Sequence, residues 1–277
     1  RRLSRAASRV ALIVFAVLYT AGCRRSESPT GRVRLNPPGF DGAQALMEVE
    51  RLVHIGPRPS GSPGAERAAI HIRQTLEAQG IVASIDTFEE ATPVGRIVFR
   101  NVSGIIPGTR DGLVVLASHY DTKAGIGDAF VGANDSGSST GLLLALARFL
   151  KQSPRLDTDI LLAFFDGEEC LRAYGPGDGL HGSRFLANRI VACGRREKIR
   201  AVIVLDMIGD RDLKVTLPRN STPDLASRVF KAAQEEGVRH RFALAPGAII
   251  DDHVPFLAAG IPTVNLIDFE YGAARGK

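Results

Sequence analysis

The sequence predicts an α/β fold, a three-layer sandwich whose mixed central sheet is mostly parallel. Four short apolar runs are typical of strands buried on both faces, because they contain almost no polar residues. These runs are Leu113–Ala117, Ile160–Phe165, Ala201–Leu205 and Pro262–Ile267. Segments with helical periodicity separate them, and strands that alternate with helices build parallel sheets covered on both faces.

The first 22 residues are typical of an export signal. A basic stretch with four arginines precedes the apolar run Val10–Leu18, which is too short to cross a bilayer as a helix. Thr20-Ala21-Gly22 before Cys23 resembles a bacterial lipoprotein cleavage site, which would make Cys23 the lipidated N-terminus. Thr20 stands where that site usually has an aliphatic residue, so an ordinary secretory signal stays open.

Three segments follow from this interpretation. Residues 1–22 are the signal peptide, 23–39 a flexible tether rich in Pro, Ser and Arg, and 40–277 one domain. We expect an exported protein of the bacterial cell envelope, held to the membrane only through its lipid anchor, or else a secreted one. The chain begins with Arg rather than Met, which suggests a fragment or an incomplete gene model.

Charge argues against a nucleic-acid partner. The net charge of +5 falls to +1 when the four arginines of the signal peptide are removed, so the sequence keeps no obvious basic face. Cys170 and Cys193 are then the cysteines left besides Cys23, and the sequence leaves open whether they pair.

The first part of the domain is predicted to contain two helices and a hairpin. Asp41 is a helix cap before a helix that ends at Gly56, and a second helix runs from Ala65 to Gly80. The strand-like segments 81–88 and 96–102 are expected to pair as an antiparallel hairpin at the sheet edge.

Three helices are predicted between and after the buried strands. Gly141–Leu150 is apolar enough to be buried, and Gly182–Arg189 is expected to form a short helix. Thr222-Pro223-Asp224 combines a cap, a first-turn proline and an acid, and Gly237 ends that helix.

Acids and a histidine follow the buried strands. His119 and Asp121 come after the first, Asp135 ends the next glycine-rich loop, and Asp206 ends the third strand. Phe-Phe-Asp-Gly-Glu-Glu closes the second strand and contains Glu168 and Glu169. Taken alone, this hexapeptide could also be a solvated Asp-Gly turn.

Because the carboxyl ends of strands in an open α/β sheet meet at one edge, we expect these side chains to converge. So many carboxylates repel one another unless a cation lies between them, and one histidine with several carboxylates suits zinc. Asp121, two residues from His119, suits a carboxylate that orients the histidine from behind.

Six motifs, in this order, resemble metallopeptidase family twenty-eight, which contains zinc aminopeptidases and glutaminyl-peptide cyclotransferases. They are His-Tyr-Asp, Gly-Ala-Asn-Asp-Ser, Phe-Phe-Asp-Gly-Glu-Glu, Gly-Ser-Arg-Phe-Leu-Ala, Leu-Asp-Met-Ile-Gly-Asp and Asp-Asp-His-Val-Pro-Phe. The resemblance covers 46–271 and implies the sandwich fold of zinc aminopeptidases. The loop Gly56-Pro57-Arg58 also looks like this family.

The resemblance implies a role for each matching residue. Asp135 resembles a bridging zinc ligand, Glu169 a zinc ligand, and Glu168 the general acid/base. In two-zinc peptidases, the positions of His119 and Asp206 hold the second ion together with the bridging aspartate. In the cyclotransferases one zinc is expected, and the position of Asp206 joins a catalytic hydrogen-bond network with that of Asp251. Tyr174 falls where this branch has a substrate-packing aromatic, usually Trp.

The resemblance favours a zinc enzyme, with one or two ions, that acts on the N-termini of peptides or proteins. Several motifs look closer to the cyclotransferase branch, which converts N-terminal Gln to pyroglutamate and ammonia. Aminopeptidase activity is the alternative. Oligomeric state and natural substrate stay open.

The C-terminus departs from the family pattern. A Trp-His-Thr segment with a zinc-ligand histidine is expected after Tyr271, but the chain reads Gly-Ala-Ala-Arg-Gly-Lys. We interpret this as a truncated end, and a catalytically inactive binding homologue is the other possibility.

Overall fold

The computed structural model describes residues 13–14, 40–127 and 129–270. Within them, one mixed sheet has eight strands in the order β1-β2-β4-β3-β5-β8-β6-β7. The strands are β1 (Val82–Thr92), β2 (Gly95–Ile106), β3 (Leu113–His119), β4 (Asp159–Phe165), β5 (Ile199–Asp206), β6 (Val215–Leu217), β7 (Phe242–Leu244) and β8 (Thr263–Ile267).

The pairing confirms the predicted fold class. Strands β4, β3, β5 and β8 run parallel to one another and form the centre of the sheet. The hairpin β1–β2 is antiparallel, as predicted, and β2 joins it to β4 in antiparallel register. The short pair β6–β7 extends the other edge, where β6 lies antiparallel to β8.

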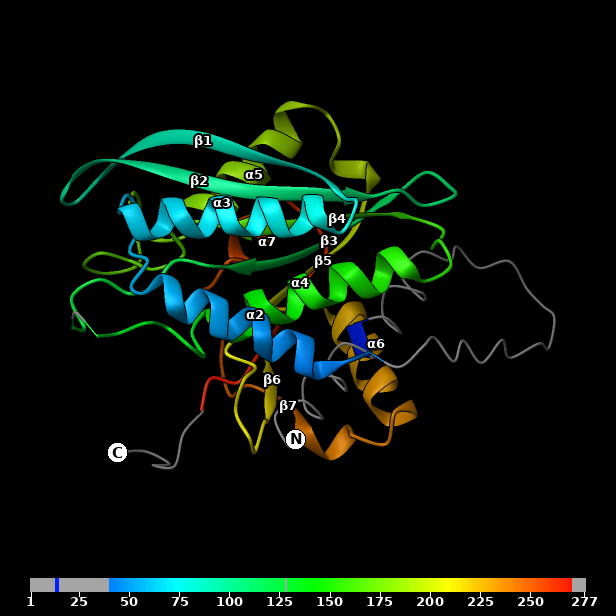
Figure 1. Ribbon diagram of the computed structural model, residues 1–277. Helices are drawn as coiled ribbons and strands as arrows, with labels where there is room; N and C mark the ends of the chain where they lie inside the picture. Colours follow the sequence, from blue (N-terminus) through cyan, green and yellow to red (C-terminus); the bar gives the residue numbers. More distant parts are fainter. Residues whose placement is uncertain (1–12, 15–39, 128, 271–277) are drawn as a thin grey trace.

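Helices cover both faces of the sheet (Figure 1). They are α2 (Gly42–Ile55), α3 (Pro63–Ala78), α4 (Gly137–Gln152), α5 (His181–Ala192), α6 (Pro223–Glu235) and α7 (Val254–Ala258). Alternate residues of β3, β4 and β5 point into two separate apolar clusters. The larger one packs against α2, α3, α4 and α6, and the smaller against α5 and α7.

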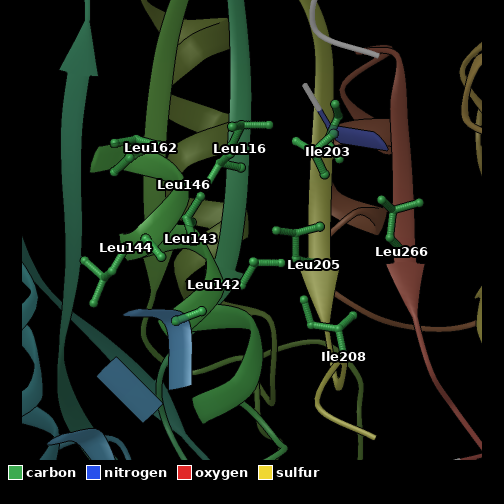
Figure 2. Packing of buried hydrophobic residues seen from close by; sticks show 14 of the residues in the cluster. Leu116, Leu142, Leu143, Leu144, Leu146, Leu162, Ile203, Leu205, Ile208 and Leu266 are labelled. Atoms are coloured by element: carbon green, nitrogen blue, oxygen red, sulfur yellow. The ribbon is translucent and has the colours of Figure 1, made fainter. Parts of the chain in front are cut away.

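Strand β3 illustrates this two-sided burial. Val114 and Leu116 belong to the larger cluster, and Val115 and Ala117 to the smaller. In Figure 2 the leucines of α4 lie against Leu116, Leu162, Ile203 and Leu205 of the strands. An uninterrupted apolar run fits this environment because neither face of the strand contacts water.

The predicted helices are present, but α4 begins at Gly137, four residues before the predicted start, and one predicted cap differs. The Asp41 carboxylate accepts a hydrogen bond from the Ala43 N–H at 2.9 Å and caps α2, as predicted. Helix α6 begins at Pro223, but the Thr222 hydroxyl makes no capping bond and instead accepts the N–H of Thr263 at 2.9 Å. This hydroxyl therefore ties α6 to β8.

Two observations concern the N-terminal and membrane predictions. Ile13 and Val14, inside the segment predicted to be a signal peptide, are fully buried in the larger cluster. In residues 13–14, 40–127 and 129–270, no helix is both long and apolar enough to cross a membrane. Lipidated Cys23 and the tether fall outside the described residues, so those assignments stay predictions.

Candidate metal and catalytic site

Strand register brings the predicted residues to one edge of the sheet. His119, the last residue of β3, lies opposite Phe165, the last residue of β4. Asp166, Glu168 and Glu169 follow Phe165 in the chain, so they lie just past the same edge of the sheet. On the other side Ala117 pairs with Val204, which places the end of β5 at the level of the end of β3. Parallel pairing thus gathers three strand ends into one site.

The core of the site is a cluster of His119, Asp135 and Asp206. His119 Nε2 lies 3.1 Å from Asp135 Oδ1 and 3.3 Å from Asp206 Oδ1. One ligand atom from each of the three lies within 4.8 Å of the others. Asp135 comes from the loop before α4, at a cis Asp135–Ser136 peptide bond, and its side chain is 25% exposed, against 1% for His119.

Asp121 supports this cluster from behind. Its Oδ1 lies 3.3 Å from His119 Nδ1, the ring atom that faces away from Asp135 and Asp206. The same carboxylate accepts the N–H groups of Glu168 and Glu169, each at 3.2 Å. Asp121 therefore couples the orientation of the imidazole to the turn that carries both glutamates.

The donor set fits a cation. When Nδ1 donates its proton to Asp121, Nε2 presents a lone pair to two carboxylate oxygens, and three such acceptors repel one another unless a cation or a proton lies between them. Without a cation, burial lowers the pKa of His119, but hydrogen bonds to the three aspartates outweigh burial and raise that pKa well above its ordinary value. One nitrogen and two carboxylates are ligands that zinc accepts.

Glu168 lies at the end of β4 in a turn that requires glycine. Gly167 has φ +78°, and a Cβ on it would stand 2.5 Å from Phe99 Cε1. The Glu168 side chain is almost completely buried, and the Tyr174 hydroxyl lies 3.1 Å from each carboxylate oxygen. Burial raises the pKa of Glu168 well above its ordinary value; His119 opposes this and Asp251 adds to it.

Glu169 has a different environment from Glu168. It is not a member of the three-residue cluster, and its Oε2 lies 3.5 Å from Lys123 Nζ. Burial raises its pKa to about 7, with Asp135 as the next contribution. The assignment of Glu169 as a metal ligand stays a prediction.

Asp251, the third residue predicted to act in catalysis, is buried. Its carboxylate accepts hydrogen bonds from the Asp252 N–H and the Asn265 side-chain amide. Burial raises the pKa of Asp251 well above its ordinary value, and Asp206 is the next cause. Asp251 and Asp206 thus influence each other electrostatically, while the roles predicted for them stay predictions.

Sequence reasoning missed the support given by Arg58. The side chain is fully buried and donates to five backbone carbonyls. These belong to Leu52, Gly56, Tyr120, Val131 and Gly132, at 2.8–3.3 Å. The arginine therefore joins the end of α2, the His119–Asp121 segment and the loop that leads to Asp135. Its position between two prolines signals a loop and gives no sign of burial.

Comparison with known proteins places this site in a family. The model of peptidase family M28 matches residues 101–274, which include every residue of the cluster. The chain belongs to peptidase family M28. This confirms the resemblance inferred from the six motifs.

The similar proteins and solved structures include glutaminyl-peptide cyclotransferases (glutaminyl cyclases) and an aminopeptidase. A glutaminyl-peptide cyclotransferase of Boiga irregularis is 32% identical over 249 residues, which cover 76% of this chain and 67% of the relative. The structure of an Acidobacteriales bacterium glutaminyl cyclase has a TM-score of 0.82 and 36% identity, covering 90% of this chain and 85% of the other. A leucine aminopeptidase precursor from Bacteroides thetaiotaomicron has a TM-score of 0.74 and 26% identity, with coverage of 84% and 86%.

The family assignment and the donor set lead to a prediction about metal binding. We expect Asp206→Asn to weaken zinc binding, because the substitution removes one of the two carboxylate charges that face His119 Nε2. Loss of a residue that only hydrogen-bonds to a metal ligand typically weakens metal affinity by about 10–100-fold, so we expect a loss of at least this size. Competition with a chelator dye measures the affinity. Asp224→Asn, on the exposed side of α6, is the control and should bind zinc as the unchanged protein does. Equal affinity of the two variants would place the ion elsewhere.

Two open points of the sequence analysis concern other residues. Cys170, which is buried, and Cys193, which is exposed, are free thiols, so they do not pair. The C-terminal residues that depart from the family pattern, 271–277, lie outside the described residues. The interpretation of this end as truncated therefore stays a prediction.

Proposed function

We propose that this protein is a zinc-dependent glutaminyl-peptide cyclotransferase that converts N-terminal Gln of peptides or proteins to pyroglutamate. The observation that carries the proposal is Glu168, an almost fully buried carboxylate beside the His119–Asp135–Asp206 cluster, with a pKa raised by burial. A carboxyl group whose pKa is raised in this way is suited to hold and return a proton. The names of relatives above 30% identity support cyclisation.

The reaction needs one proton to move and no redox partner. The α-amine nitrogen attacks the side-chain amide carbon, a C–N bond forms to close the lactam, and the bond to the amide nitrogen breaks. Glu168 accepts the proton that the α-amine loses and returns it to the departing nitrogen, which leaves as ammonia. Both reacting groups belong to one residue, so positioning is the main task of the protein.

The chain's own residues would perform the remaining tasks. In the one-zinc arrangement that the resemblance implies for cyclisation, Asp135, next to His119, and the predicted ligand Glu169 would hold the ion, and Asp206 would join a hydrogen-bond network with Asp251. The ion would polarise the carbonyl group under attack. Asp121 keeps His119 and the backbone of Glu168 in register. The buried setting of Glu168 limits exchange of its proton with bulk water.

Aminopeptidase activity is a second candidate, and one observation favours it. The tight cluster consists of the three residues whose positions hold the second ion in two-zinc peptidases, and in this geometry Asp206 faces His119 directly. Two ions per chain would suit hydrolysis of the first peptide bond, whereas one ion would leave Asp206 available to Asp251.

Product analysis separates the candidates. Purified protein loaded with zinc is incubated with a Gln-peptide and with the same peptide beginning with Leu, and ammonia, pyroglutamyl peptide and free amino acid are quantified beside the zinc content. We expect ammonia and pyroglutamyl peptide in equal amounts from the first peptide and no reaction of the second. Free Leu would support the peptidase instead. Absence of every product would favour the inactive binding homologue.

A further inference from the structure

The Tyr174 side chain carries a contact that its predicted role does not use. The resemblance assigns its ring to substrate packing, yet the hydroxyl points inward and donates to the Glu168 carboxylate, 3.1 Å from both oxygens. The residue is 37% exposed overall, so part of it stays accessible to substrate while its hydroxyl contacts Glu168. The tryptophan usual at this position in the cyclotransferase branch has no hydroxyl.

The segment that carries Tyr174, residues 170–179, is held in place by Asp178. This carboxylate accepts the N–H groups of Leu171, Arg172 and Ala173 at 2.5–2.9 Å. Burial would raise the pKa of Asp178, but these three donors outweigh it and lower that pKa. An ionised carboxylate with three backbone donors fixes the path of the chain on both sides of the tyrosine.

The ring itself has close neighbours. Gly179 has φ +76°, and a Cβ there would stand 2.6 Å from Tyr174 Cδ1, so the ring occupies space that only glycine leaves free. Lys123 Nζ lies 5.6 Å from the ring centroid, within the range of a cation–π contact, and also pairs with Glu169. The ring is therefore confined, and its hydroxyl has a defined direction.

We propose that Tyr174 is a positioning residue for Glu168. The torsion angle χ3 of a glutamate, which rotates its carboxylate, normally takes a broad range of values. A hydroxyl equidistant from both oxygens restricts this rotation. The orientation of Glu168 toward the two nitrogens of the substrate then depends on Tyr174. The consequence for turnover rests on the cyclotransferase function proposed above, whereas the contact itself does not.

Spectroscopy tests the contact without any substrate. The chain has no Trp and four Tyr, so tyrosine dominates its near-ultraviolet spectrum. The difference between the unchanged protein and Tyr174→Phe isolates the Tyr174 band. We expect Glu168→Gln to shift this band to shorter wavelength, because an amide is a weaker acceptor for the phenol than a carboxylate. The same substitution in the Tyr174→Phe background should leave the tyrosine spectrum unchanged. A band that Glu168→Gln does not move would overturn the proposal.

Kinetics test the consequence. We expect Tyr174→Phe to lower kcat about 10-fold, the effect of one lost hydrogen bond to a charged group, with KM and zinc content unchanged. Raised KM with unchanged kcat would mean that Tyr174 only packs against substrate, and would overturn the positioning role. If the unchanged protein cyclises no Gln-peptide, the proposed function fails, while the spectral shift still decides whether Tyr174 holds Glu168.

Discussion

Glu168→Gln is expected to retain zinc and to lose turnover on Gln-peptides by about 10²–10⁴-fold, the usual contribution of a positioned acid/base. Glutamine has nearly the same size, and its carbonyl oxygen can still accept the Tyr174 hydroxyl. The backbone N–H of residue 168 stays on Asp121. What disappears is the group that can take and return a proton. The rate of ammonia release under saturating substrate gives the turnover, and the amount of bound zinc per chain is measured on the same samples.

The neighbouring residue provides the matched control. Glu169→Gln makes the same chemical change one residue further along, at the predicted metal ligand. We expect this variant to lose zinc and activity together, and excess zinc should restore part of the activity. If Glu168→Gln loses zinc to the same extent, Glu168 is a ligand. If it turns over normally, the proposed proton transfer is wrong.

Arg58→Met is expected to lower the free energy of unfolding by about 3–5 kcal/mol, the range seen when one partner of a buried charged network is removed. Methionine fills part of the volume, but five carbonyl oxygens lose the guanidinium as a donor, although the Gly132 oxygen keeps the N–H of Gly137. Loss of donors to buried acceptors is costly. Burial already lowers the pKa of Arg58 to about 10, with Asp121 and Asp135 opposing that shift. Denaturant unfolding of the zinc-free protein measures the loss.

Two further variants show whether this effect depends on the arrangement of donors. Arg58→Lys keeps the charge but cannot reach five carbonyls from one point, so we expect an intermediate loss. Arg67→Met, on the exposed face of α3, should change stability by less than about 0.5 kcal/mol. Equal stability of Arg58→Met and Arg67→Met would refute the structural role given to the buried guanidinium.

The fold was largely predictable because its central strands are buried on both faces. Runs such as Ile160–Phe165 leave no polar residue that could belong to an exposed segment, and the helices between them carry clear start and stop signals. Strands β6 and β7 were missed because three residues are too few to show a period. Helix α7, five residues long, was missed for the same reason.

The site was predictable mainly where chemistry coincides with a strand end, and Asp135, which ends a glycine-rich loop, was predicted beside these residues. His119 and Asp206 follow apolar strands directly, so parallel pairing was enough to bring them together. The contacts made by Arg58, and those of Lys123 with Glu169 and Tyr174, join segments far apart or depend on the direction of a side chain. Neither spacing nor composition encodes such contacts, because the loops that make them have no period.

The three hydrogen bonds accepted by Asp178 make residues 170–179 a self-supporting module. Its internal bonds fix its shape, and it contacts the site through the Tyr174 hydroxyl on Glu168 and through Cys170 on Lys123. The residue at position 174 could therefore be substituted without changing the arrangement of the His119–Asp135–Asp206 cluster. Members of the family could diverge in selectivity by single substitutions there, while the strand ends would stay under the stricter constraint of the cation site proposed above.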